Sequence, residues 1–366
     1  MTTAPHSAIV VGAGVFGCAC AYYLAKSGVA VTVIERDRFG AHASSNNPGN
    51  INPIHGAPPA LIPLALEAFS LHRVLLAELT ALGCAAYDWR PVRRVLLALD
   101  ESDMQHLHLA QLAFADRAGF NATRLGGAAV AALDARLSGG IEAGLLVEGN
   151  MSLDSGRFHH ALAEAAGKLG AIFVRGKVSG LIEENGNAVG LRTSEGEFAA
   201  DAFVFATGAW TAPWDKQLGM TLPVSPVKGE MLALDLPGPP LGYDFTHGMV
   251  SLYRRGEREC WIGVTKDNAG FDETPSEAVR LRLIEAASRI MPAVASAPVL
   301  AHTAALRPMS ADGLPLAGRV PGRDNCFVAN GGGIKGMLLC SAIGQGIAQL
   351  MINGSSALPF PPLARE

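Results

Sequence analysis

Short apolar runs alternate with a longer apolar stretch near the start of the chain. Ala8–Val11 and Val29–Ile34 are short and continuously apolar, which is typical of strands buried on both faces of a parallel sheet. Between them, Ala19–Lys26 is an apolar stretch of helical length, and Gly28 stands where a helix cap is expected. The pattern therefore predicts a strand, a helix and a second strand in succession.

The same alternation continues along the rest of the chain. Short buried strands are predicted at Ala202–Ala206 and Cys326–Ala329, and a strand followed by a bend at Ala171–Val178. Ala86–Leu99 has the pattern of strands joined by a turn, and Gly144–Asp154 that of a strand and a loop. Helices are predicted at Leu64–Leu82, Asp103–Ala118, Arg157–Leu169, Ser276–Met291 and Gly336–Met351.

A change of character after Pro213 indicates a second domain. The segments P-V-K-G-E-M-L-A-L, V-S-L-Y-R-R and C-W-I-G-V-T alternate apolar with polar residues and carry aromatic ones, which predicts antiparallel strands. This character persists to Ala301, after which glycine-rich sequence returns. The chain is therefore expected to combine an α/β part with an α+β part.

Composition and charge exclude several classes of protein. Of the 366 residues, 49% are apolar and 17% are charged, which indicates a well-buried globular chain large enough for two domains. The net charge is −4 and no block of Lys or Arg stands out, so we expect no nucleic acid and no anionic membrane as a partner. The six cysteines are scattered, so neither a disulfide framework nor a metal site is expected.

The apolar stretch from Ala8 to Ala25 has the composition of a signal or membrane segment. It lacks the basic residues that precede the apolar core of a signal, and its glycines have another explanation. No other uninterrupted apolar run approaches about 18 residues. We therefore expect no membrane span and, by default, a cytoplasmic protein.

Three glycines after the first predicted strand carry the first candidate chemistry. Gly12, Gly14 and Gly17 have G-x-G-x-x-G spacing, which suits a tight turn, a close approach to a pyrophosphate and a helix lying close to the strand. Glu35 ends the second strand, where a carboxylate would bind a ribose 2′-hydroxyl and repel a 2′-phosphate. The pattern predicts a dinucleotide site; the alternative is an α/β turn that only needs its glycines.

Further polar and glycine-rich segments extend this candidate site. The helix predicted from Gly336 follows the glycines at 331–333, so its N-terminus is a second place for an anion or a dipole. Thr207 and Gly208 end another buried strand. The loop 38–63 is long enough to be functional. It holds polar residues that either face a ligand or only form turns, namely Ser44, Ser45, Asn46, Asn47, Asn50, Asn52 and His55.

Taken together, these motifs resemble the D-amino-acid-oxidase-like flavoprotein family. The motifs are the glycines with Glu35, A-S-S-N-N-P-G, F-A-T-G-A-W, P-V-K-G-E, A-L-R-P-x-x-x-D-G-x-P and G-G-G-I-K-G, and they cover nearly the whole chain. The members most like this chain are glycine oxidase, monomeric sarcosine oxidase and the small D-amino acid dehydrogenases.

The resemblance implies a fold and a cofactor. It implies a discontinuous Rossmann-like FAD-binding domain, residues 1–85, 142–212 and 302–366, and a substrate domain of mainly antiparallel sheet with helices, residues 86–141 and 213–301. No cysteine matches a flavin-linking one, so FAD is expected to be non-covalent. The implied cofactor contacts are Gly12, Gly14, Val15, Phe16, Gly17, Glu35, Arg36, Ser44, Ser45, Asn50, Val178, Thr207, Gly208, Trp210, Arg307, Gly332, Gly333, Ile334, Lys335 and Gly336.

The resemblance also implies three residues near the reacting atoms. Arg307 in A-L-R-P matches an arginine that holds the substrate carboxylate, and a planar carboxylate suits a bidentate guanidinium; the alternative is a structural ion pair. Lys335 either shares the substrate or only touches the flavin. Tyr253 either faces the substrate or is a core aromatic residue.

The implied reaction is the oxidation of a C–N bond in a small amino acid or an N-substituted glycine. Hydride would pass from Cα to the flavin, the imine would be hydrolysed to glyoxylate or a keto acid plus an amine, and oxygen would become hydrogen peroxide. Trp261 stands where sarcosine oxidase has a lysine linked to oxygen activation, and the asparagine-rich loop resembles that of D-amino acid dehydrogenases. The alternatives are therefore a dehydrogenase that reduces a quinone or a partner subunit, and a flavin-binding subunit without activity.

Overall fold

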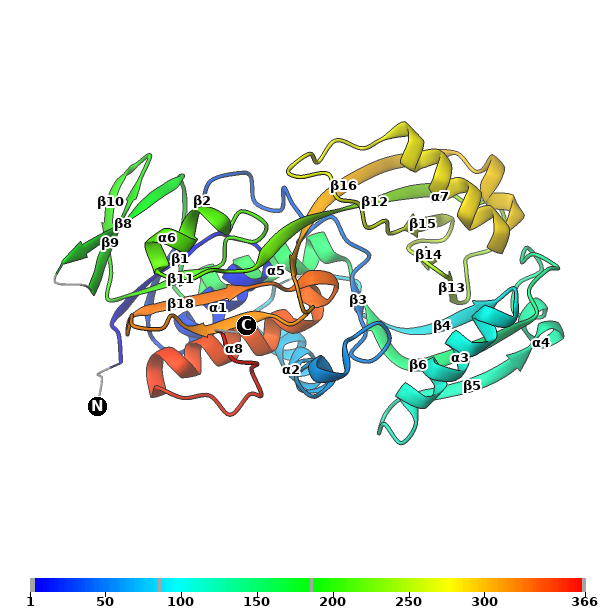
Figure 1. The fold of residues 1–366 in the computed structure, drawn as a ribbon, viewed down its shortest axis with the longest axis horizontal. Coiled ribbons are helices and arrows are strands. Elements are labelled where there is room, and N and C mark those ends of the chain that lie inside the picture. The colour runs from blue at the N-terminus through cyan, green and yellow to red at the C-terminus, as the bar shows by residue number, and fades with distance from the viewer. Residues whose placement is uncertain (1–3, 85–86, 185–186, 364–366) are drawn as a thin grey trace. The chain divides into compact units, whose positions relative to one another are not determined.

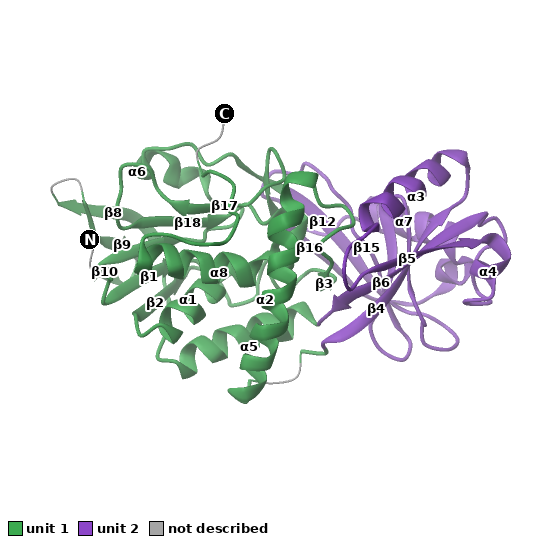
Figure 2. Ribbon diagram, turned by 90° about the horizontal axis from the view of Figure 1, so that it is seen from below, with its two compact units in different colours: residues 1–88, 154–226, 307–366 green, residues 89–153, 227–306 purple. Residues whose placement is uncertain are grey.

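The structure is a computed structural model that describes residues 4–84, 87–184 and 187–363. It divides into two compact units, coloured separately in Figure 2: unit 1 comprises residues 1–88, 154–226 and 307–366, and unit 2 comprises residues 89–153 and 227–306. The sequence had predicted a boundary at residues 85–86, which lie outside the described residues. Residues 142–153 and 302–306, which the prediction had placed in the FAD-binding domain, are part of unit 2. Conversely, residues 87–88 and 213–226, which it had placed in the substrate domain, are part of unit 1.

Unit 1 is built on a six-stranded sheet with the order β17-β18-β11-β1-β2-β7. Figure 1 labels β18, β11, β1 and β2 of this sheet. All of its neighbouring strands are parallel except the pair β17 and β18. The carboxyl ends of the parallel strands therefore meet along one edge of the sheet. The strands are β1 (Ser7–Val11), β2 (Ala30–Glu35), β7 (Ile172–Arg175), β11 (Ala202–Phe205), β17 (Leu316–Arg319) and β18 (Cys326–Asn330).

Helices pack together in unit 1 as a layer (Figure 2). α1 contacts both α5 and α8, and α2 contacts α8. α1 is apolar all round and nearly completely buried, as expected of a helix between a sheet and other helices. These helices are α1 (Val15–Lys26), α2 (Ile62–Ala81), α5 (Ser155–Lys168) and α8 (Gly336–Asn353).

A smaller antiparallel sheet contributes a further layer to unit 1. Its strands are β8 (Val178–Glu184), β9 (Asn187–Thr193) and β10 (Gly196–Ala199). Leu181 and Leu191 of this sheet share one apolar core with Ile9 and Phe203 of the parallel sheet. Unit 1 also contains the short elements β3 (Asn50–Ile51), η1 (Pro59–Leu61), η2 (Ala212–Trp214), α6 (Asp215–Leu218) and η4 (Gly333–Lys335).

Unit 2 contains a sheet in which β12-β15-β14-β13-β4-β6 are neighbours in that order, with β16 beside β12 and β5 beside β6. The pairs β12–β15, β15–β14, β14–β13, β4–β6 and β5–β6 are antiparallel, and β13–β4 is parallel. The strands are β4 (Arg90–Ala98), β5 (Asn121–Gly126), β6 (Ala143–Ser152), β12 (Val224–Asp235), β13 (Asp244–His247), β14 (Val250–Arg254), β15 (Glu259–Gly263) and β16 (Val299–Ser310).

Unit 2 also contains helices, some of which pack on this sheet. They are α3 (Glu101–Phe114), α4 (Gly127–Ala131), α7 (Glu277–Ile290) and η3 (Pro292–Ser296). Leu283, Ala287 and Ile290 of α7 pack on apolar residues of β12, β14 and β15 in one core. α3 begins after Asp100, whose side chain accepts a hydrogen bond from the Asp103 N–H, so the helix starts two residues before the predicted Asp103.

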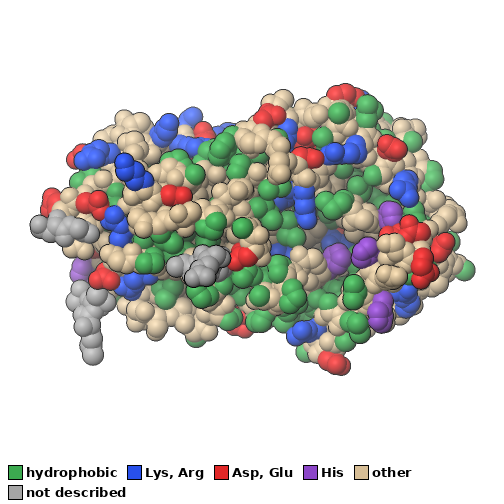
Figure 3. Space-filling model, in the orientation of Figure 1, with side chains coloured by type: hydrophobic (Ala, Val, Ile, Leu, Met, Phe, Trp, Pro, Cys, Tyr) green, Lys and Arg blue, Asp and Glu red, His purple; other side chains and the backbone are tan. Residues whose placement is uncertain are grey.

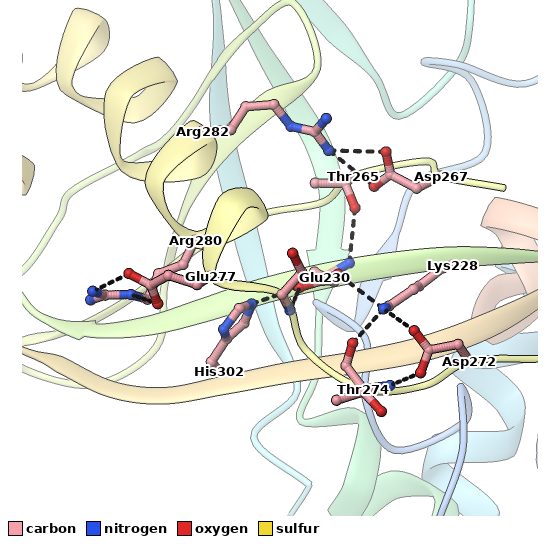
Figure 4. Close-up of polar contacts among 11 residues, drawn as sticks. Lys228, Glu230, Thr265, Asp267, Asp272, Thr274, Glu277, Arg280, Arg282 and His302 are labelled. Atoms are coloured by element: carbon pink, nitrogen blue, oxygen red, sulfur yellow. Dashed lines mark hydrogen bonds and ion pairs between the residues drawn. The ribbon is translucent and has the colours of Figure 1, made fainter. Parts of the chain in front are cut away.

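Unit 2 also buries a network of charged side chains (Figure 4). Glu230 on β12 is 1% exposed, and its carboxylate lies 3.3 Å from the Lys228 ammonium and 2.8 Å from His302 Nε2. The Ser276 N–H donates to the same carboxylate. Lys228 also donates to the carbonyl of Thr274 and to Asp272. The network therefore ties the segment between β15 and α7 to β12.

Two helical stretches, 59–81 and 333–353, are long and apolar enough to cross a membrane by length and composition alone. The second contains α8, which packs against α1 and α2. Of the most apolar 18-residue segment of this stretch, 67% is buried inside the protein. On the face shown in Figure 3, acidic and basic side chains are interspersed. The absence of a membrane span stays a prediction.

Candidate functional site

The candidate site lies in unit 1, at the edge where the parallel strands end. Gly12 follows β1, Glu35 ends β2, Thr207 comes shortly after β11, and the glycines at 331–333 follow β18. In an open α/β sheet, ligands bind at this edge. The sheet therefore brings together residues that the sequence had placed in four separate motifs.

The glycines of the first turn are required by close backbone contacts. Gly12 has a φ of +99°, and a Cβ there would lie 2.5 Å from the Ala206 carbonyl oxygen. A Cβ on Gly17 would lie only 1.9 Å from the Gly12 carbonyl oxygen. Gly14 is less crowded, because the nearest atom to a Cβ there is Ser44 Oγ at 3.3 Å. Helix α1 begins at Val15, four residues before the predicted Ala19, because Gly17 lets its first turn lie against the strand.

Glu35 links the turn to the end of β2. Its Oε2 accepts a hydrogen bond from the Ala13 N–H at 2.7 Å, and its Oε1 accepts one from the Asp37 N–H at 2.9 Å. Each carboxylate oxygen can accept a second hydrogen bond, so the carboxylate can still bind the hydroxyls of a ribose. This geometry fits the ribose contact that the sequence predicted.

The serine-rich loop closes over the start of α1. Ser44 Oγ accepts a hydrogen bond from the Val15 N–H at 2.8 Å, which satisfies a donor in the first turn of the helix. Ser45 Oγ lies 3.4 Å from His159 Nδ1. The amides of Asn46 and Asn47 donate to carbonyls within the loop, so both residues serve the loop's own conformation.

Aromatic and charged side chains stack beside Glu35. The Arg36 guanidinium lies 4.1 Å from the centre of the Trp210 ring, and the His42 ring lies 4.4 Å from it. Hydrogen bonds from His42 and Arg36 hold the pKa of Asp37 below its ordinary value. The sequence singled out Arg36 and Trp210 but not His42, because no local pattern indicates this stacking.

A second turn is formed by the glycines before α8. Gly331 and Gly333 have φ values of +67° and +51°, which favour glycine. Phe16 of α1 lies against Gly332, where a Cβ would be 2.8 Å from its ring. Asn330 donates from its amide to the Gly208 carbonyl and to Thr211, and so joins this turn to the one after β11. Asn330 and Thr211 were not among the predicted site residues.

Lys335 and the loop 52–55 are joined by hydrogen bonds. The Lys335 ammonium is buried and donates to the carbonyls of Asn52 at 2.8 Å and His55 at 2.7 Å. Asn52 Oδ1 in turn accepts from the N–H groups of Ile54 and His55. These contacts give Lys335 a role in positioning the loop, which the sequence did not indicate.

Arg307 is half-buried in the part of β16 that belongs to unit 1. Met309 lies two residues further along the strand, so its side chain is on the same face. A Cβ on Gly333 would lie 3.1 Å from Met309 Sδ, which places this face of β16 beside the second glycine turn. Arg307 is therefore on the face of the strand that borders the candidate flavin site.

Val178 and Tyr253 are among the predicted residues that lie outside these contacts. Val178 begins β8, two residues after Gly176, whose N–H donates to the Glu35 carbonyl. Tyr253 lies on β14 in unit 2, is 8% exposed, and has the Arg94 guanidinium 5.5 Å from its ring centre. These surroundings favour the core-aromatic interpretation of Tyr253.

The six cysteines and His72 are buried and neutral. Burial raises the pKa of all six cysteines, so they are thiols rather than thiolates. Burial lowers the pKa of His72 to about 4. Among residues 4–84, 87–184 and 187–363, no group of three or more His, Cys, Asp or Glu side chains is placed to hold a metal ion.

Comparison with known proteins extends these observations. Residues 7–350 match the family model described as "FAD dependent oxidoreductase". The chain is 29% identical to glycine oxidase of Pseudomonas aeruginosa over 98% of each chain, and 31% identical to D-amino acid dehydrogenase of Methylobacterium nodulans over 98% of this chain and 97% of the relative. The crystal structure of glycine oxidase from Geobacillus kaustophilus has the same fold, with a TM-score of 0.92 at 27% identity, over 99% of this chain and 98% of that one.

Proposed function

Because the chain belongs to the family of FAD-dependent oxidoreductases, we propose that it oxidises the C–N bond of glycine or of an N-substituted glycine. The observation that carries this proposal is the position of Arg307. It lies on the face of β16 that borders the second glycine turn, where a guanidinium can hold a carboxylate beside a flavin. The relatives named glycine oxidase support the same substrate class.

The residues of unit 1 fit FAD. Glu35 offers carboxylate oxygens to a ribose, and the crowded Gly12 and Gly17 bring the start of α1 close to the strand ends. The N-terminus of α8 follows the second glycine turn, so it would supply positive potential to a flavin bound at this turn, which gains negative charge on reduction. Bound FAD supplies the acceptor for the hydride removed from the substrate. We propose non-covalent binding, because no cysteine of this chain matches a flavin-linking one.

The protein's own contribution is then to bind and orient the substrate. Arg307 would pair with the carboxylate through two parallel hydrogen bonds, which fixes the direction of Cα. A positive charge near the amine also lowers the amine pKa and favours the neutral form that can lose hydride. Oxygen is the proposed electron acceptor, and the imine product would be hydrolysed by water.

The test combines a substrate screen with variants of Arg307. Hydrogen peroxide would be measured with glycine, sarcosine, longer N-alkyl glycines and D-amino acids. Arg307→Ala should keep FAD and lose on the order of thirty- to several-thousand-fold in kcat/KM, the range for truncating one partner of a buried charge pair. Arg307→Lys should restore only part of the lost kcat/KM, because the point charge of an ammonium cannot replace the two parallel hydrogen bonds of a planar guanidinium.

A control separates this role from a general effect of removing an arginine. Arg192 on β9 is exposed and pairs with Glu197 on the neighbouring strand, so Arg192→Ala should leave kcat/KM unchanged. An amine substrate without a carboxylate should be nearly insensitive to Arg307→Ala. Loss of FAD, or unfolding, with a normal KM in the remaining enzyme would show that Arg307 is structural.

A dehydrogenase is the second candidate, and two observations favour it. The Methylobacterium nodulans relative is named D-amino acid dehydrogenase, and Trp261 stands where sarcosine oxidase has a lysine linked to oxygen activation. The Arg255 guanidinium lies 4.5 Å from the Trp261 ring centre. Rapid bleaching of the flavin by substrate, followed by slow recolouring in air and fast recolouring with a dye acceptor, would establish a dehydrogenase. If no substrate bleached the flavin, the result would support a flavin-binding subunit without activity.

A further inference from the structure

We propose that His159 is a positioning residue for the pyrophosphate of FAD, and that it acts by holding the peptide between Ala13 and Gly14 in one orientation. This inference rests on the FAD site described above and names a residue of α5 that no motif of that site contains. The carbonyl of Ala13 is held toward α5, so the N–H of Gly14 points to the opposite side, where it can donate to the phosphates.

The contact between His159 and the glycine turn is short and buried. His159 is 3% exposed, and its Nε2 lies 2.7 Å from the Ala13 carbonyl oxygen. A carbonyl can only accept, so Nε2 carries the hydrogen and Nδ1 is the acceptor of the ring. Ser45 Oγ lies 3.4 Å from Nδ1 and donates to it. The ring is therefore held at both nitrogens, one facing the turn and the other facing the serine-rich loop.

A second donor reaches the same carbonyl. Cys18 Sγ lies 3.3 Å from the Ala13 oxygen and 3.5 Å from His159 Nε2. Burial raises the pKa of the Cys18 thiol well above its ordinary value, so the thiol keeps the hydrogen that it donates. Both lone pairs of the Ala13 oxygen are then satisfied, on the side of the turn that faces α5.

This arrangement decides what the turn presents to an anion. In a trans peptide the carbonyl and the following N–H point in opposite directions, so a fixed Ala13 carbonyl fixes the N–H of Gly14 on the opposite side. The Glu35 carboxylate fixes the preceding peptide by accepting from the Ala13 N–H at 2.7 Å. Gly14 has no Cβ to restrict its rotation, so side chains must hold this peptide in place. A carbonyl turned toward the phosphates would repel them.

The charge state of His159 agrees with this geometry. Burial lowers its pKa, which keeps the ring neutral and leaves Nδ1 able to accept from Ser45. Glu35 on β2 opposes this shift, and His160 on the same helix adds to it. Ser155, at the start of α5, donates to the carbonyls of Ser45 and Asn47 and so holds the loop against the helix that carries His159.

The test measures ligand binding to the protein from which FAD has been removed. His159→Leu removes both hydrogen bonds of the ring and should weaken binding of FAD and of ADP roughly tenfold to a hundredfold, as expected when a buried carbonyl loses the stronger of its two donors. Adenosine, which has no phosphate, should bind as it does to the unaltered protein. His159→Gln keeps an N–H donor at about the distance of Nε2 and should restore most of the affinity for ADP. The matched control is His160→Leu, because His160 is the exposed neighbour on the same helix.

The outcomes separate the proposal from its alternatives. Equal FAD and ADP affinities in His159→Leu and His160→Leu would overturn it. An equal loss for ADP and adenosine, with a lower melting temperature, would show a merely structural histidine and would also overturn it. If His159→Leu does not fold, Cys18→Ala removes the second donor to the same carbonyl and should weaken ADP binding but not adenosine binding. An unaltered protein that binds no FAD would instead contradict the proposed function.

Discussion

The packing of α1 on α8 offers a sharp test of the fold around the site. Gly344 of α8 lies so close to α1 that a Cβ there would be 2.7 Å from the Ala19 backbone carbon and side chain. Carbon atoms normally approach to about 3.5–4.0 Å, so Gly344→Ala requires the two helices to move apart by roughly 1 Å. Backbone atoms are among those contacted, and a backbone cannot rotate out of the way as a long side chain can.

The expected magnitude follows from two opposing effects. Overpacking a core typically costs about 1–3 kcal/mol, whereas replacing a glycine inside a helix by alanine otherwise stabilises by roughly 0.5–1 kcal/mol. Gly167 in α5 is the matched control, because a Cβ there meets no atom within 4 Å. Both variants add one methyl group and restrict the unfolded chain equally, so their difference measures the packing of α1 on α8 alone.

The assay is thermal unfolding of both variants, with and without FAD. Gly167→Ala should raise the melting temperature slightly, and Gly344→Ala should lower it by a few degrees. Gly344→Ala should also weaken FAD binding, because α1 and α8 both begin at the glycine turns of the site. Equal stabilisation by the two substitutions would refute the close packing of these helices.

Three further results are expected. Glu230→Ala should cost about 3–5 kcal/mol in chemical denaturation, because it leaves the Lys228 ammonium buried without this partner, whereas the exposed Glu277→Ala should change little. Burial lowers the pKa of His72 to about 4 in the folded protein. As the pH falls, the unfolded chain therefore binds a proton at this histidine before the folded protein does. Stability that is present above about pH 6.5 should therefore fall by roughly 3 kcal/mol as the pH drops from about 6.5 to 4, and His72→Gln should flatten this part of the profile. Glu35→Ala should weaken FAD binding about tenfold or more in a fluorescence titration, because it removes the acceptor of the Ala13 N–H as well as the ribose contact.

The parts of the fold that depend on neighbouring residues could be predicted from the sequence. The first strand, helix and strand follow from apolar runs and glycine spacing, and the structure has β1, α1 and β2 there. The family, its mixed α/β fold and its FAD cofactor were also predicted correctly, and the family and fold comparisons confirm them. Local patterns suffice for such features because helix and strand periods repeat within a few residues.

The exact ends of elements depended on contacts that no local pattern contains. α1 starts four residues earlier than predicted because Gly17 fits under the Gly12 carbonyl. β6 belongs to the sheet of unit 2 because it pairs with β4 and β5, although its sequence alone does not indicate which sheet it joins. Strand pairing is decided between segments, so it cannot be deduced from either segment alone.

The connections within the site were decided by the tertiary structure. His159 and Ala13 are 146 residues apart, Lys335 and Asn52 are 283 apart, and Asn330 and Gly208 are 122 apart. The motifs identified the glycines and Glu35, because few other residue types can occupy such a tight turn or bind the hydroxyls of a ribose. The side chains that hold these groups in position could not be identified from the sequence. A buried histidine, lysine or asparagine acquires its role only from the partner that folding brings to it.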